Sequence, residues 1–219
     1  MPTISRAATS AVRPPIFVIL PGVTADADRF AACQALAHEF WPEATVWMPN
    51  YLSRLRGVRG TGRWLDRWTG DTLGSADAVF VLAYILGGAA LPRAPQLVSR
   101  LRRAVLVRSR YQEEIPRLLR RRLGWLGTGL LWGHSIADLG TSSFWPGDFR
   151  LGCPHLALVE TRPSQLAIRL KAAPLSDAEL GIYAYQEVAV NHDVAYHSRL
   201  LMKAATEWLK AGDVHTVPI

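Results

Sequence analysis

Short runs of apolar residues alternate along this chain with longer segments whose apolar positions repeat at helical spacing. Short apolar runs are typical of strands buried on both faces of a sheet. Six runs are expected to form strands: residues 16–20, 45–48, 79–84, 104–107, 155–160 and 187–190. Because they alternate with helical segments, the sequence predicts an α/β fold, a mainly parallel sheet with helices on both faces.

Two of the intervening segments have a clear helical pattern. Residues 29–40 place apolar side chains near one face, and Asp26 or Asp28 is positioned to cap the first turn. Residues 198–210 are strongly amphipathic, with leucine, alanine and tryptophan along a single face. Both segments are therefore expected to be helices that pack on the sheet.

One interval, Tyr111 to Gly152, contains no strand pattern. It includes IPRLLRRRLGWLGTGLLWG, a basic amphipathic stretch followed by an apolar stretch spaced by glycines. An insertion at the carboxyl end of a parallel sheet is where a lid over a binding site lies. An ordinary helical excursion packed on the core is the alternative. We expect one domain over residues 1–219, with a helical, lid-like insertion at residues 111–152.

Charge is distributed unevenly in this chain of 219 residues, whose formal net charge is +7. Between Arg93 and Arg122 there are ten arginines against two acids, Glu113 and Glu114. An anionic partner surface is one explanation. Arginine stems that cover apolar surface, or a general bias toward arginine in a chain with three lysines, are others. No specific nucleic-acid motif is present, and the sequence does not indicate an oligomeric state.

The remaining composition argues against several classes of protein. Cys33 and Cys153 form no CxxC pattern, which favours a reducing compartment over a zinc site or a disulfide framework. The first residues lack an apolar signal region, and no run is long enough to span a bilayer, so a cytoplasmic location is expected. Neither GxGxxG nor a P-loop occurs, and the segment HDVAYH at residues 192–197 offers too few metal ligands. No cofactor or metal is therefore expected.

The stretch VFVLAYILGGAALP, residues 79–92, has the form of a strand, a sharp turn and a helix that starts with small residues. This is the context of the G-x-S-x-G nucleophile elbow, in which small residues let the helix approach the strand closely. The five positions of the elbow read AYILG, residues 83–87. Ile85 therefore occupies the position of the nucleophile.

Three segments in order resemble the α/β-hydrolase fold family over most of the chain. FVILPGVTADADRF resembles the strand and turn before the oxyanion loop, with Pro21 in place of the usual histidine. FVLAYILGGAALP resembles the elbow, and EVAVNHDVAYHSRLLMKAATEWL resembles the last strand, the histidine loop and the final helix. The family's first two strands have no room before Ile16, so the resemblance implies a truncated α/β-hydrolase-like sheet.

The resemblance also assigns site residues. The catalytic histidine falls on His192, and the nearest carboxylate to the acid position is Glu160. Ile85 has no lone pair and cannot form an acyl intermediate. The oxyanion donors fall on the backbone N–H groups of Val23 and Leu86, which survive side-chain replacement. A pocket for a carbonyl or carboxylate oxygen at Val23, Ile85 and Leu86 is therefore expected.

A rival elbow lies at residues 133–137, where GHSIA matches G-x-S-x-A with Ser135 as nucleophile. Its context is poorer, because GLL before it is short for a central strand.

Three hypotheses about function follow from these residues, and whether the chain is an enzyme stays open. The first is a hydrolase-like protein that binds or transforms a small apolar or acyl-type molecule through His192, without an acyl-enzyme. The second is a serine esterase or thioesterase using Ser135 and His192. The third is a pseudoenzyme that binds an anionic partner.

Overall fold

The computed structural model describes residues 14–23, 26–51, 53–74, 78–141, 151–182 and 185–211. Six strands form one sheet in the order β2-β1-β3-β4-β5-β6, and all neighbouring pairs are parallel. The strands are β1 Ile16–Leu20, β2 Thr45–Trp47, β3 Val79–Tyr84, β4 Leu101–Ser109, β5 His155–Glu160 and β6 Tyr185–Val188. The predicted α/β class with a single parallel sheet is confirmed.

Three strands differ from their predicted bounds. β2 ends one residue earlier than expected, at Trp47, and β4 ends two residues later, at Ser109. β4 begins three residues earlier than expected, because its first residues include the exposed Arg102 and the strand is fully buried only from Ala104 onward. β6 lies two residues earlier than expected. It pairs only with β5 at the edge of the sheet, so it contains the exposed Gln186 and Glu187. An apolar run detects central strands better than an edge strand.

The helices, including the short 3-10 turns η1 and η3, cover both faces of the sheet. They are α1 Ala27–Phe40, α2 Ser53–Leu73, α3 Ile85–Ala90, η1 Leu91–Arg93, α4 Pro95–Val98, α5 Glu114–Trp132, α6 His134–Leu139, α7 Gln165–Leu170, α8 Asp177–Leu180, η3 Ala195–His197 and α9 Arg199–Lys210. The Asp26 side chain caps α1 by accepting from the Arg29 N–H at 2.9 Å, and Ser198 caps α9. Of the two predicted caps for α1, the structure selects Asp26.

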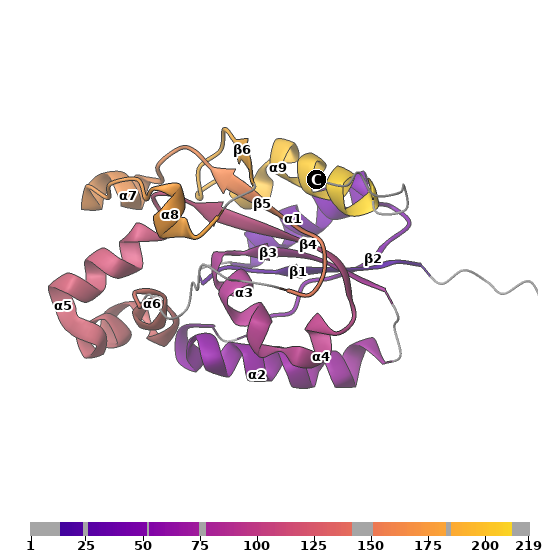
Figure 1. The fold of residues 1–219 in the computed structure, drawn as a ribbon, viewed down its shortest axis with the longest axis horizontal. Coiled ribbons are helices and arrows are strands. Elements are labelled where there is room, and N and C mark those ends of the chain that lie inside the picture. Colours follow the sequence, from indigo (N-terminus) through magenta and orange to yellow (C-terminus); the bar gives the residue numbers. More distant parts are fainter. Residues whose placement is uncertain are drawn as a thin grey trace, which may run out of the picture.

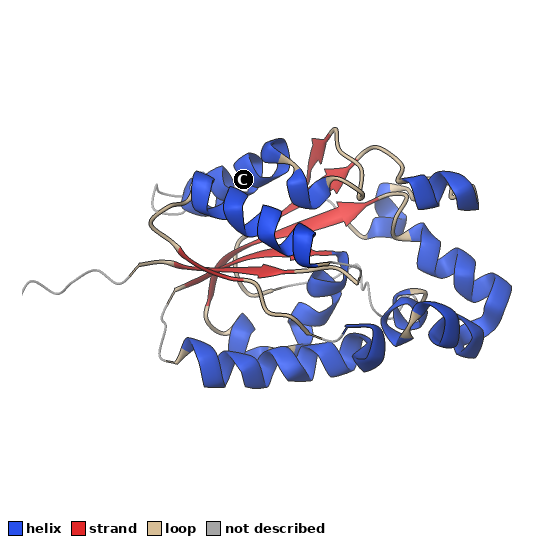
Figure 2. Cartoon of the chain, turned by 180° about the vertical axis from the view of Figure 1, so that it is seen from behind, coloured by secondary structure: helices blue, strands red, loops and turns tan. Residues whose placement is uncertain are grey.

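Two apolar cores lie on opposite faces of the sheet. α1 and α9 cover one face, where Phe17, Tyr84 and Leu158 are buried. α2, α3 and α4 cover the other face, where Val18 and Leu86 are buried (Figures 1 and 2). The remaining helices, α5 to α8, lie beyond the carboxyl ends of the strands, at the left of Figure 1. The insertion predicted at residues 111–152 contains α5 and α6, and residues 142–150 lie outside the described residues.

The junction of β3 and α3 is the predicted strand, turn and helix. β3 ends at Tyr84 and α3 begins at Ile85, with extended backbone at Tyr84 (φ −77°, ψ 156°). A Cβ added at Gly87 would lie 2.6 Å from the carbonyl oxygen of Leu20, so only glycine permits this approach of α3 to β1. Among the described residues, Lys171 alone has positive φ without being glycine. The backbone at Ile85 therefore lacks the positive φ of a strained turn.

Candidate functional site

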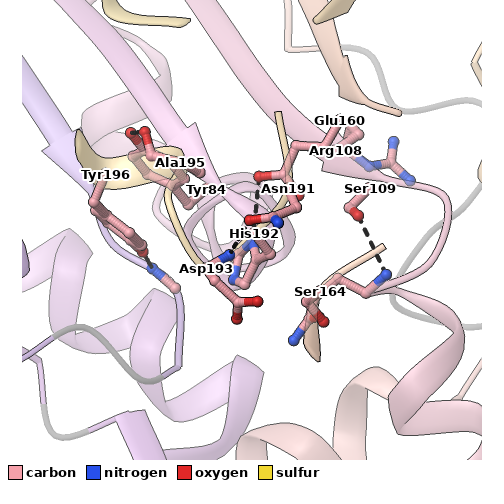
Figure 3. A network of polar contacts seen from close by, with 12 residues as sticks. Tyr84, Arg108, Ser109, Glu160, Ser164, Asn191, His192, Asp193, Ala195 and Tyr196 are labelled. Atoms are coloured by element: carbon pink, nitrogen blue, oxygen red, sulfur yellow. Dashed lines mark hydrogen bonds and ion pairs between the residues drawn. The ribbon is translucent and has the colours of Figure 1, made fainter. Parts of the chain in front are cut away.

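The carboxyl ends of β3, β5 and β6 bring three of the predicted site residues to one edge of the sheet. Ile85 follows β3, Glu160 is the last residue of β5, and His192 lies in the loop after β6. His192 Nδ1 lies 3.2 Å from Glu160 Oε1, and both side chains are buried (Figure 3). The histidine and the acid suggested by the sequence thus form a contact, although they are 32 residues apart.

The Glu160 contact orients the imidazole of His192. A carboxylate accepts, so Nδ1 carries the proton and Nε2 keeps its lone pair in the neutral ring. Burial, the largest single influence, lowers the pKa of His192. The charge of Glu160 and its hydrogen bond outweigh burial, and the pKa is raised above its ordinary value of 6.5. His192 is therefore held as a proton acceptor and donor near neutral pH.

Nε2 of His192 faces the turn that follows β1. A Cβ built at Gly22 would lie 3.0 Å from the Tyr196 hydroxyl, 3.9 Å from His192 Nε2 and 4.0 Å from the Cβ of Tyr84. Nε2 therefore lies close to Gly22, which in turn lies close to Tyr84, the last residue of β3. The free lone pair of the imidazole therefore faces the junction of β1 and β3.

Tyr196 is a polar residue of this site that the sequence did not assign. The Gly22 N–H donates to its hydroxyl at 2.5 Å, and its ring stacks on Tyr84 with centroids 4.1 Å apart (Figure 3). The Tyr84 hydroxyl donates to the Ala195 carbonyl at 3.5 Å. Burial raises the pKa of Tyr196 far above its ordinary value, so the phenol keeps its proton. The sequence feature that could have identified Tyr196 is its position four residues after His192, in the segment HDVAYH.

The predicted oxyanion pocket is lined with apolar side chains. Ile85 exposes 6% of its surface and belongs to the apolar cluster on the α2 and α3 face of the sheet, with Leu86 and Leu139. Val23 packs against the same cluster. The Leu86 N–H lies in the first turn of α3, where backbone donors have no partner within the helix, and Tyr84 provides no side-chain cap. The apolar side chain of Ile85 therefore lies next in sequence to a backbone donor at the start of α3.

Ser135 is placed in a different setting. It lies in α6, which follows α5 directly, and its side chain is buried. Gly133, with φ 96°, separates two helices, so the GHSIA motif is preceded by a helix and not by a strand. α6 packs against α2, α3 and α5, whereas His192 lies in the loop after β6. The structure brings His192 together with Glu160.

Arginines of the segment from Arg93 to Arg122 are spread over several environments. Arg108 forms a buried ion pair with Glu113, with both guanidinium–carboxylate hydrogen bonds at 2.8 Å. Arg110 pairs with Asp177, and Arg103 lies over the ring of Trp208. Four further arginines lie on α5: Arg117, Arg120, Arg121 and Arg122. Arg121 pairs with Glu114, so the net positive charge of the segment is shared by α5 and by the arginines that precede it.

A polar network next to Glu160 supports the loop after β4. The Ser109 N–H donates to Glu113, the Gln112 N–H donates to the Ser109 hydroxyl, and Ser164 donates to Gln112 (Figure 3). These contacts join the loop after β4 to the segment that follows β5. The network therefore fixes the wall of the site on the side of Glu160.

The residues that the structure describes contain neither a candidate metal cluster nor a candidate membrane-spanning helix. No group of three or more histidine, cysteine, aspartate or glutamate side chains gathers there as metal ligands would. None of the helices described by the structure is both long and apolar enough to cross a bilayer.

The parallel sheet and its covering helices form an α/β-hydrolase fold, which solved structures share. The chain is similar to Bacillus licheniformis lipase BlEst2 (TM-score 0.61, 13% identity, 90% of each chain covered). It is also similar to an extracellular α/β-hydrolase from a Paenibacillus species (TM-score 0.55, 15% identity, 92% of this chain and 100% of the other). A third similar structure is MGS-MChE2, an α/β-hydrolase from a lagoon-sediment metagenome (TM-score 0.55, 18% identity, 91% and 92%).

No family model and no curated protein sequence matches this chain. The structural neighbours named above are 13 to 18% identical, so they establish the fold and leave the activity to the site residues.

Glu160→Gln is expected to lower the pKa of His192 below 6.5, because burial remains while the carboxylate charge is lost. In the natural protein, the interaction with Glu160 that raises the pKa of His192 also stabilises the fold. This contribution is fully present below pH ~6.5 and is lost as the pH rises through the raised pKa. Titration of the His192 ring by NMR measures the shift directly. Asp193→Asn, which removes a smaller influence on the same ring, is the matched control and should lower the pKa less. An unchanged His192 pKa in Glu160→Gln would contradict this account.

Proposed function

We propose that this protein binds a small apolar carbonyl compound, such as a short ester, and acts on it through His192 without forming an acyl-enzyme. One observation carries the proposal: the Glu160–His192 pair is in place, while the elbow position beside it holds Ile85. An isoleucine side chain has no atom that adds to a carbonyl. The histidine is therefore left with general acid–base work.

The chemistry needs one water molecule and no covalent intermediate. Nε2 of His192 takes a proton from water, and the resulting hydroxide adds to the carbonyl carbon. The negative oxygen formed in that step is stabilised by the Leu86 N–H, in the role the sequence assigns to Leu86 and Val23. The same Nε2–H then returns its proton to the departing oxygen. Glu160 keeps the imidazole oriented and favours its protonated form during the step.

The apolar surroundings support a small ligand. Ile85 and Leu86 are buried with Leu139 of α6, and His192 exposes 8% of its surface. A bulky or charged molecule would lose its hydration against these side chains. A structural neighbour is described as a thermophilic esterase from Thermogutta terrifontis (TM-score 0.51, 14% identity), which is consistent with ester chemistry on this fold.

A fluorophosphonate probe tests the absence of an acyl-enzyme, because it labels activated serines covalently without requiring knowledge of the substrate. The natural protein is expected to gain no mass. Ile85→Ser is expected to stay unlabelled as well, because its hydroxyl would start a relaxed helix and not a strained elbow. Intact-mass spectrometry reads both results.

The control for this experiment is Ser135→Ala. A probe adduct on the natural protein that is absent from Ser135→Ala would replace this proposal with a serine esterase or thioesterase that uses Ser135 and His192. Strong labelling of Ile85→Ser at the new serine would show instead that the elbow geometry is intact.

A further inference from the structure

Exposed apolar side chains gather at one end of the molecule. Six of the ten large apolar side chains that are exposed among the described residues lie on α5 and at the start of α2. We call this group the α5 patch: Leu55, Leu123, Trp125, Leu126, Leu130 and Leu131. Leu126 exposes 71%, Leu130 exposes 86% and Leu55 exposes 72% of its surface. Such a concentration on a water-soluble surface marks an interaction site.

The two parts of the patch are adjacent in the structure. A Cβ added at Gly133, just after α5, would lie 2.9 Å from the carbonyl oxygen of Arg54, the residue before Leu55. The end of α5 therefore packs on the first turn of α2. The two parts of the patch thus belong to neighbouring segments at one end of the molecule.

A bend at Gly124 projects the patch outward. Gly124 has φ 68° and ψ 177°, which divides α5 into a basic half and an apolar half. Every residue from Arg121 to Leu126 is exposed, and the two halves of α5 form the left-hand end of the molecule in Figure 1. The patch therefore projects away from the sheet, where a flat surface can contact it.

The charged side chains around the patch are mostly positive. No aspartate or glutamate occurs from Ile115 to Ala137, and none occurs from Ser53 to Leu65. Arg54 and Arg56 flank Leu55, and Arg122 precedes Leu123, and all three side chains are exposed. Asp138 borders the patch, and its carboxylate accepts from the Val58 N–H and from the Trp125 ring N–H. The patch is therefore an apolar surface within a cationic rim.

We propose that the α5 patch binds the surface of an anionic lipid bilayer. Exposed leucines and a tryptophan enter the boundary between headgroups and acyl chains, while arginines contact lipid phosphates. A second copy of the chain is a poorer occupant, because pairing two such patches would bring their arginines together. The proposal is independent of the chemistry at His192.

Co-sedimentation with vesicles tests the proposal on the full chain. Binding is expected to vesicles of phosphatidylcholine with phosphatidylserine, with weaker binding to phosphatidylcholine alone and a decline as salt is added. The double variant Leu126→Gln, Leu130→Gln is expected to bind these vesicles at least about tenfold more weakly, since two apolar side chains no longer enter the bilayer. Replacing Arg54 and Arg122 with glutamine is expected to weaken binding about fivefold for each arginine.

Matched controls lie elsewhere on the surface. Leu200→Gln changes a leucine of similar exposure, 57%, on α9, and Arg102→Gln changes an exposed arginine at the start of β4. Both controls should bind vesicles like the natural protein, and circular dichroism should show every variant folded. Absence of binding to the anionic vesicles, or equal binding by the double leucine variant, would overturn the proposal. A dimer in light scattering that the leucine variant abolishes, without vesicle binding, would assign the patch to a second copy.

Discussion

His192→Ala is expected to lower kcat/KM for p-nitrophenyl butyrate by about 100-fold to 10,000-fold, the range that a positioned acid–base group contributes. The reason is geometric: Nε2 is the proton acceptor directed at the junction of β1 and β3, and Glu160 holds the ring by its other nitrogen. The protonated ring cannot act as a base. The rate of the natural protein should therefore rise with pH through the raised pKa of His192 and then level off.

His197→Ala is the matched control, since this exposed histidine belongs to the same segment, in η3. It should leave kcat/KM near that of the natural protein. Ester hydrolysis that persists in His192→Ala would refute acid–base work by this residue. A loss of hydrolysis in Ser135→Ala, together with probe labelling at Ser135, would favour the serine mechanism.

Glu113→Gln is expected to destabilise the fold by about 3 to 5 kcal/mol, because it leaves the Arg108 charge buried without its carboxylate. The side chains of this pair expose 6% and 1% of their surface. Arg108 would keep the Leu180 carbonyl, at 2.9 Å, as an acceptor, and the Ser109 N–H would lose the charged acceptor that holds the turn after β4. The free energy of unfolding in urea measures the change.

The comparison is Glu39→Gln, which breaks the ion pair with Arg199 on the surface, where the side chains expose 44% and 65%. Solvent screens such a pair, so the expected loss is below about 1 kcal/mol. A loss of similar size in both variants would mean that the Arg108–Glu113 pair contributes no more than a surface contact.

Local patterns in the sequence predicted much of the fold. Continuous apolar runs identified β1, β3 and β5 at their observed bounds, because central strands of a parallel sheet are buried on both faces. The glycines and alanines after Tyr84 predicted the close approach of α3 to β1. Asp26 predicted the cap of α1, because a cap depends on residues within one turn. The predicted bounds of edge strand β6 were two residues too late, because the exposed face of this strand carries polar residues.

The candidate site was predicted in part. The sequence indicated His192, Ile85 and Glu160 one by one, each at the end of a strand. It left the acid uncertain, because Glu160 lies inside β5 and not in the loop after it. The role of Tyr196 was missed, since the donor to its hydroxyl, Gly22, is 174 residues away.

By itself, the sequence determined the fold class and the succession of strand, turn and helix around Ile85. Both depend on neighbours within a few residues, because strand and helix periodicity are local properties. Only the tertiary structure decided that Glu160 meets His192, that Arg108 pairs with Glu113, and that α5 bends at Gly124. These outcomes depend on which strands pair and on which side chains the packing leaves in water. No local pattern contains that information, because the contacting groups come from distant parts of the chain.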